Sequence, residues 1–121
     1  MHNAAQAYGK VARQIATPRE LEANLLLRAA AQLQAVCSEW QERQSELHEA
    51  LLFNRKLWTI LLTAVTSEGN QLSAEIRQNV ANLGVFVMKQ TVDMSGEPHP
   101  DKLRPLININ RELAAGLLGR G

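Results

Sequence analysis

Aromatic residues, cysteine and long hydrophobic runs are all scarce in this chain of 121 residues. Aromatics make up only 4% of the sequence, so aliphatic and alanine side chains must supply most of the core. That composition favours helices over a β-sandwich or barrel, because strands prefer aromatic and β-branched residues. The single cysteine, Cys37, excludes an intramolecular disulfide and fits a reducing compartment. Its apolar neighbours, residues 33–36, indicate a small buried hydrophobe rather than a reactive thiol.

Membrane, export and nucleic-acid signals are also missing. The longest apolar run covers only residues 57–65, far short of the roughly 20 residues of a membrane span. Residues 1–4 lack the basic and apolar regions of a secretory signal, so we expect a cytoplasmic location. The net charge is +1, with 13 Lys and Arg against 12 Asp and Glu spread along the chain. This balance argues against strong attraction to nucleic acid or to an anionic membrane.

No residue pattern predicts an active site, a metal site or a cofactor site. The three histidines, His2, His48 and His99, are far apart and have no second ligand at metal-binding spacing. Pairing Cys37 with His48 would leave the nucleophile without an orienting third group. The glycines are isolated, which excludes a phosphate-binding loop, and the carboxylates fall on polar faces. We therefore predict a protein that is not an enzyme and that needs no cofactor.

Helical spacing of apolar residues begins near the N-terminus. Residues 3–16 carry Ala4, Ala7, Tyr8, Val11, Ala12 and Ile15 on one side, the pattern of an amphipathic helix. Gly9 weakens such a helix by roughly 1 kcal/mol relative to alanine, so its stability must come from docking.

A capping signal then starts a long second helix. Thr17 is a good N-cap, Pro18 suits the first helical position and Glu20 completes a capping box. One face of this helix is predicted to carry Leu21, Leu25, Ala29, Leu33, Val36 and Trp40, with Leu26, Ala30 and Cys37 beside it. The polar residues 41–46 should break the helix, with Ser45 capping the next one, because a continuous helix over 18–68 would be unusually long.

Two further helices are predicted before a stiff loop. The third covers about 46–68 and ends at Gly69 as its C′ residue. The fourth runs from about 72 to 94, before Gly96, with one stripe of Leu72, Ile76, Val80, Leu83, Val87 and Thr91. The Pro-rich residues 97–101 then form a linker.

The last segment is ambiguous by pattern. Residues 107–110 alternate like a strand, whereas Leu106, Ile109, Leu113 and Leu117 follow helical spacing. No other strand exists for pairing, so we predict a helix over about 105–118. Periodicity favours permanent burial of this helix, but a mobile lid or an element swapped between protomers stays open. The whole is predicted to be all-α, a small bundle of four to five helices with antiparallel neighbours in a single domain, 1–121.

A polar triplet interrupts the most apolar helix. Asn54, Arg55 and Lys56 precede Trp58 within residues 50–62, which are otherwise almost entirely apolar. Such polar groups must find partners or reach water, because an unpaired buried polar group costs roughly 1–3 kcal/mol. Trp58 is interpreted as core and Arg55 as paired, although basic residues beside an aromatic also suit RNA binding.

Short motifs along most of the chain, from about residue 4 to 117, resemble the flagellar biosynthesis regulator family FlaF. The pieces are Ala4-x-x-Ala7-Tyr8, Thr17-Pro18-Arg19-Glu20-Leu21-Glu22, Ala50-Leu51, Asn54-Arg55-Lys56-Leu57-Trp58, Asn70-x-Leu72, Ile76-Arg77, Leu106-Ile107-x-Ile109-Asn110 and Leu113-Ala114-x-Gly116-Leu117. Their order and spacing carry the resemblance, since each piece alone is weak. Ser73 stands where the family pattern leads us to expect proline, which leaves the start of the fourth helix open.

The resemblance implies a non-enzymatic cytoplasmic protein that promotes flagellin synthesis or secretion and opposes FlbT, a repressor of flagellin mRNA translation. The expected partners are flagellin, bound as by a chaperone, and FlbT, with no membrane and no direct nucleic-acid contact. An apolar groove that accepts an amphipathic helix would suit flagellin. The candidate contacts are Asn54, Arg55, Trp58, Ile109, Asn110, Leu113 and Leu117. The alternatives are a regulator acting directly on flagellin mRNA and an oligomeric scaffold without a client.

Overall fold

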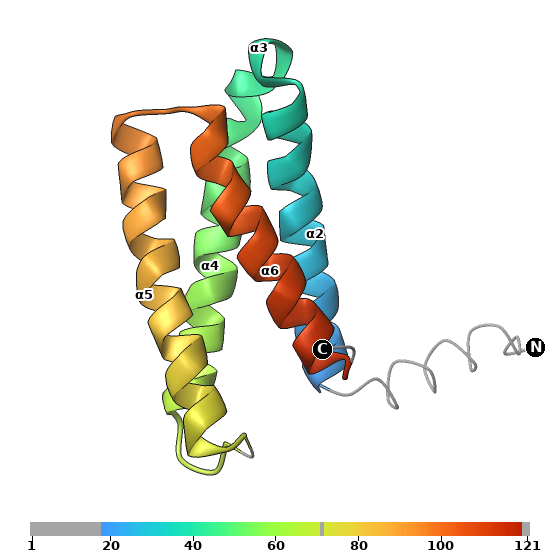
Figure 1. Cartoon of the computed structure of the whole chain (residues 1–121), viewed down its shortest axis with the longest axis vertical. Helices are drawn as coiled ribbons and strands as arrows, with labels where there is room; N and C mark the ends of the chain where they lie inside the picture. Colours follow the sequence, from blue (N-terminus) through green and yellow to red (C-terminus); the bar gives the residue numbers. More distant parts are fainter. Residues whose placement is uncertain (1–17, 71, 120–121) are drawn as a thin grey trace, which may run out of the picture.

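The computed structural model of the chain describes residues 18–70 and 72–119, and these residues are mostly helical with no strand among them (Figure 1). The long helices are α2 (Pro18–Ser38), α4 (Leu47–Thr66), α5 (Ala74–Gly96) and α6 (Leu103–Leu117). Short helical turns connect them: α3 (Trp40–Arg43), η1 (Gln44–Glu46) and η2 (Pro100–Lys102). The predicted all-α class is confirmed, and the ambiguous last segment is a helix. The predicted helix over 3–16 and the Thr17 cap lie outside the described residues.

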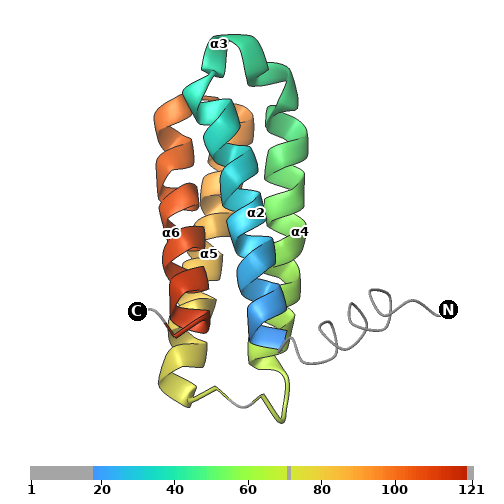
Figure 2. The ribbon, with the colours of Figure 1, turned by 90° about the vertical axis from the view of Figure 1, so that its right-hand side faces the viewer.

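The four long helices form a bundle in which neighbours run antiparallel (Figures 1 and 2). The last helix, α6, packs mainly along α2, whereas α5 packs mainly along α4. Short connections place α5 and α6 side by side near η2, but the two helices contact each other little. Figure 1 shows them diverging away from that connection. One edge of the bundle is therefore splayed.

The predicted break after α2 is present and is bridged by one arginine. Arg43 Nε donates to Glu46 at 2.8 Å, and its Nη1 donates to Glu39 at 3.2 Å. The hydrogen bond and charge of Glu46 raise the pKa of Arg43 above its usual value. Glu46, and not Ser45, occupies the N-cap position of α4, and its side chain makes no capping hydrogen bond. The prediction of Ser45 as the cap was wrong because the η1 turn carries the chain past it before α4 begins.

The connection between α4 and α5 is closed by side-chain caps. Gly69 has φ of 83°, a left-handed conformation that glycine adopts without strain, and it follows the Ser67 C-cap by two residues. Arg77 Nε donates to the Val65 carbonyl at 2.6 Å, which satisfies a carbonyl at the end of α4. Ser73 accepts from the Ile76 N–H at 3.2 Å and is the N-cap of α5. Ser73, where the family pattern leads us to expect proline, therefore caps the start of α5.

The core consists of aliphatic side chains from all four long helices around Trp58, which is fully buried. Two predicted core positions are wrong: Leu21 is 52% and Leu25 is 38% exposed. Leucine occupies residues 25–27 consecutively, so periodicity could not show which side of α2 faces inward. The buried face carries Ala23, Leu26, Ala29, Ala30, Leu33 and Val36. Cys37 is only half-buried, with its Sγ 3.5 Å from the Pro100 carbonyl that accepts its hydrogen bond.

Candidate partner-binding site

Two asparagines and a tryptophan form a hydrogen-bonded cluster in the centre of the bundle. Trp58 Nε1 donates to Asn110 Oδ1 at 2.9 Å, and Asn110 Nδ2 donates to Asn54 Oδ1 at 2.7 Å. The same Asn110 amide reaches the Leu26 carbonyl on α2 at 3.3 Å. All three side chains of this amide cluster are fully buried. The cluster therefore ties α6 to both α2 and α4.

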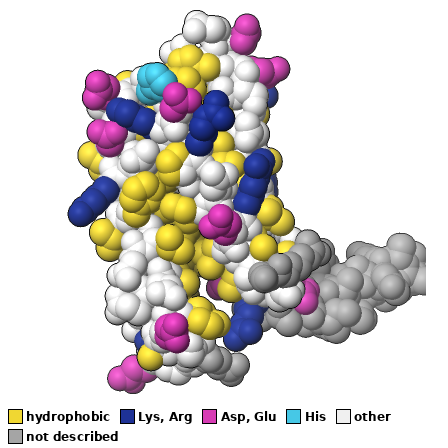
Figure 3. Space-filling model, in the orientation of Figure 1, with side chains coloured by type: hydrophobic (Ala, Val, Ile, Leu, Met, Phe, Trp, Pro, Cys, Tyr) yellow, Lys and Arg dark blue, Asp and Glu magenta, His cyan; other side chains and the backbone are white. Residues whose placement is uncertain are grey.

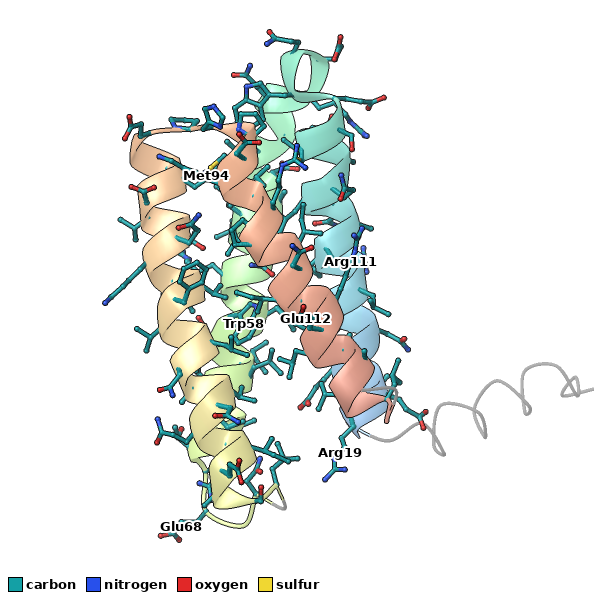
Figure 4. The ribbon with its side chains drawn as sticks, viewed as in Figure 1. Arg19, Trp58, Glu68, Met94, Arg111 and Glu112 are labelled. Atoms are coloured by element: carbon teal, nitrogen blue, oxygen red, sulfur yellow. The ribbon has the colours of Figure 1, made fainter. Side chains whose placement is uncertain are left out.

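The amide cluster contains one unsatisfied group. Asn54 Nδ2 is buried and has no hydrogen-bond partner. Buried polar groups weaken a core relative to apolar packing unless every one is satisfied, but they restrict the relative positions of the helices that carry them. The cluster thus fixes the register of α6, and the unpaired Nδ2 reduces the stability gained. Figure 4 shows Trp58 in the interior between the helices.

The other two members of the polar triplet reach solvent. Arg55 and Lys56 are exposed on α4. Arg55 borders a small hollow of about 70 Å³ between α4 and α5, whose lining also includes His48, Thr91 and Ser95. Arg55 therefore lies on the α4–α5 side of the bundle, apart from the C-terminal candidates on α6.

Partly exposed apolar side chains line the splayed edge between α5 and α6. We call this surface the α5–α6 seam and define it by Ile76, Leu83, Phe86, Ile109, Leu113 and Leu117. Two contacts show which side of α5 faces α6 and which side faces α4. Gln90 Nε2 donates to the Lys102 carbonyl at 3.0 Å, so its side of α5 faces α6, while Gly84 on the other side abuts Leu62 of α4. Phe86 and Leu83 lie one and two turns before Gln90 on the α6-facing side.

A contact with α2 likewise shows which side of α6 contributes to the seam. Ile107 contributes with Cys37 to a small hollow against α2, so this flank of α6 faces α2. Ile109 and Leu113 lie on the opposite flank, and Leu117 lies at the end of α6, where it also borders Leu27 of α2. All three are half-buried and packed against the core. On α5, Phe86 is 41% exposed and Ile76 is 46% exposed, although Ile76 continues the buried stripe of Val80 and Val87. Figure 3 shows hydrophobic side chains gathered on this face of the molecule.

Charged and polar contacts join α5 to α6 at the end of the seam near η2, which we call its closed end. Lys102 Nζ lies 3.0 Å from Asp93 and 3.7 Å from Glu97. The hydrogen bond to Asp93 is the main cause that raises the pKa of Lys102 above its usual value. Together with the Gln90 contact, these interactions join the end of α5 to the start of α6. The far end of the seam has no such connection among the interactions of the described residues.

The structure divides the predicted contact residues into three groups. Asn54, Trp58 and Asn110 meet in the buried amide cluster, so a partner would reach them only if α6 moved. The three apolar candidates of α6, Ile109, Leu113 and Leu117, lie together on the seam. Arg55 lies on α4 beside the hollow between α4 and α5, apart from the seam and from the other candidates. Their role in binding stays a prediction.

Sequence reasoning missed the contribution of α5 to this surface. The sequence pattern places Leu83 and Ile76 on the one predicted stripe of this helix and assigns no role to Phe86. The available signal was Phe86 itself, an aromatic residue beside the buried stripe in a chain with few aromatics. Its exposure depends on the divergence of α6, which the local pattern does not encode.

Within the described part of the chain, no group of three or more His, Cys, Asp and Glu residues is placed to hold a metal ion. The same residues include no helix with the length and apolarity needed to cross a bilayer. Among the residues that the structure describes, the buried polar side chains are Asn54, Thr91 and Asn110, and the buried indole N–H of Trp58 joins them.

The fold and these surfaces define a small helical-bundle protein with a buried amide cluster and a partly exposed apolar seam. A family model described as "Flagellar protein FlaF" matches residues 4–117. The chain belongs to the FlaF family and is a flagellar protein. No curated protein and no solved structure matches the chain.

Proposed function

We propose that this protein is a non-enzymatic regulator that binds flagellin in the cytoplasm as a chaperone. Binding would promote flagellin synthesis and secretion and oppose repression by FlbT. Family membership supports a role in the flagellar system. The observation that carries the proposal further is the α5–α6 seam, whose apolar side chains remain partly exposed between two diverging helices.

The chemistry of the seam suits a helical client. An amphipathic helix recognises an apolar surface through anchors at i, i+3, i+4 and i+7. Ile109, Leu113 and Leu117 present side chains at four-residue spacing along α6, and Phe86 and Leu83 face them from α5. The ends of flagellin are expected to be amphipathic helices that need cover before export, so they are the partner segment proposed here.

Calorimetric titration of the purified protein with monomeric flagellin tests the proposal. We expect Phe86→Asp to weaken binding at least about tenfold, which corresponds to about 1.4 kcal/mol, because a charge would enter the apolar contact. Val92→Asp is the matched control, because Val92 is 73% exposed and lies on the outward side of α5. Both variants should melt like the unmodified protein.

Three outcomes would contradict the proposal. Absence of binding at tens of micromolar, about 10–50 µM and with both proteins folded, would remove flagellin as the client. Equal loss of affinity in both variants would remove the seam as the site. Binding of FlbT with flagellin excluded would redirect the function to that regulator, so FlbT is titrated in parallel.

A further inference from the structure

We propose that residues 3–16 of this same chain dock on the α5–α6 seam as an amphipathic helix. The seam gathers partly exposed apolar side chains from two neighbouring helices of the bundle. The sequence of the segment places Ala4, Ala7, Tyr8, Val11, Ala12 and Ile15 on one apolar stripe at helical spacing. The apolar stripe of the segment would therefore cover the exposed apolar side chains of the seam, and the seam would cover the stripe.

The point of attachment brings the segment to the open end of the seam. The described chain begins at Pro18, and the next residue, Arg19, lines a hollow together with Leu117 and Leu118. Leu117 is also the last residue of the seam. Residue 16 is therefore only a few positions before Arg19, which lies beside the end of α6 that diverges from α5.

Length permits this docking. A helix over residues 3–16 would be about 21 Å long, whereas the stretch of α6 from Ile109 to Leu117 is about 12 Å long. The segment can therefore turn back beside α6 and cover the exposed part of the seam.

The charges also match. Residues 1–17 contain Lys10 and Arg13 and no acidic residue. Glu112 lies one turn after Ile109 and borders the seam on α6, and Glu75 borders it on α5 at helical spacing from Phe86. Figure 4 shows Glu112 on α6. Both carboxylates are exposed, so Lys10 and Arg13 could each meet a carboxylate, while Lys89, one turn after Phe86, adds one positive charge to the α5 rim.

A disulfide trap tests the docking without any partner. In the full chain carrying Cys37→Ala, Val11→Cys is combined with Leu113→Cys on the seam. The matched control combines Val11→Cys with Val92→Cys on the outward side of α5. We expect the seam pair to form an intramolecular disulfide at least about tenfold faster, because docking raises the effective concentration of the two thiols. Equal rates, or a disulfide that links two chains at every dilution, would overturn the proposal.

A second measurement uses the natural cysteine background. Hydrogen exchange is compared between Val11→Asp, on the predicted apolar stripe, and Gln6→Asp, on its polar side. We expect amides of residues 109–117 to exchange at least about fivefold faster only in Val11→Asp, because a covered helix opens less often. Unchanged exchange in both variants would overturn the docking. Since flagellin is absent from both experiments, their failure leaves the proposed function untouched.

Discussion

At the scale of single residues, the amide cluster shows what local pattern can and cannot predict. The sequence indicated that Asn54 must find a partner, and the structure supplies Asn110. These residues are 56 positions apart, and their pairing depends on the rotation of two helices relative to each other. Burial of Trp58 was predictable from its apolar neighbours, whereas its hydrogen bond to Asn110 was not.

Asn110→Ala should strongly destabilise the protein. It leaves Trp58 Nε1 without its acceptor and Asn54 Oδ1 without its donor, and each orphaned buried group costs about 1–3 kcal/mol. Urea denaturation measures the free energy of unfolding. Asn108→Ala, on the exposed side of the same helix, is the control and should change it by less than about 0.5 kcal/mol. Similar losses in both variants would show that the cluster contributes nothing specific.

Glu22→Gln should raise the melting temperature near neutral pH. Partial burial raises the pKa of Glu22 above its usual 4.5, and nearby Arg19 only partly opposes this. A raised carboxyl pKa means that folding is favoured while the group is protonated and that this contribution is lost as pH rises. The uncharged glutamine avoids that loss, so the difference should vanish well below pH 4.5. The exposed Glu42→Gln is the control, and a pH-independent difference would contradict the assignment.

At the scale of elements, most helices were predictable because caps and breaks are local. Pro18, the polar residues 41–46 and the Pro-rich loop after Gly96 mark boundaries that the structure retains. Errors arose where a cap has several candidates, as at Ser45, or where leucines are consecutive, as at residues 25–27. The inward face of α2 is set by the helices that pack on it and not by its own sequence.

Ser73→Ala should lower the free energy of unfolding by about 1 kcal/mol, because the Ile76 N–H loses its side-chain acceptor at the start of α5. Thermal or urea unfolding gives the value. Ser45→Ala is a suitable comparison, since Ser45 resembles a cap in sequence but does not occupy the N-cap of α4. A larger loss for Ser45→Ala than for Ser73→Ala would reverse this assignment.

Gly84→Ala should also destabilise the protein, although alanine is the better helix former. An added methyl group would overlap the side chain of Leu62, and overpacking costs about 1–3 kcal/mol against a propensity gain of up to about 1 kcal/mol. Gly116→Ala, also in a helix, has open space around it and should be neutral or stabilising. If both alanines stabilise equally, α4 and α5 are not in close contact at Gly84.

At the scale of the whole molecule, three helix pairs of the bundle are well packed, α2 with α6, α4 with α5 and α2 with α4, and the edge between α5 and α6 is weakly packed. The sequence predicted the all-α class and the antiparallel order. It did not predict which edge opens, because divergence depends on the sum of packing along each helix. This open edge is where both proposals place a helical ligand.

Binding to flagellin should therefore have the thermodynamic signature of apolar contact. Titrations at several temperatures should give a negative heat-capacity change. The affinity should change little between about 50 and 200 mM salt, whereas direct contact with flagellin mRNA would weaken steeply over that range. The same titration with flagellin leader RNA provides the comparison. Strong, salt-sensitive RNA binding would favour direct action on the mRNA.

The pairing of α2 with α6 also bears on how the protein is made. Asn110 contacts the Leu26 carbonyl across 84 positions of sequence, so the first and last described helices complete each other. During synthesis, α4 can cover only part of the apolar face of α2, and the part that packs against α6 stays uncovered until α6 has left the ribosome. Contacts this distant in sequence form slowly. A truncated product ending before Leu103 should therefore aggregate or be degraded, although it contains three of the four long helices described.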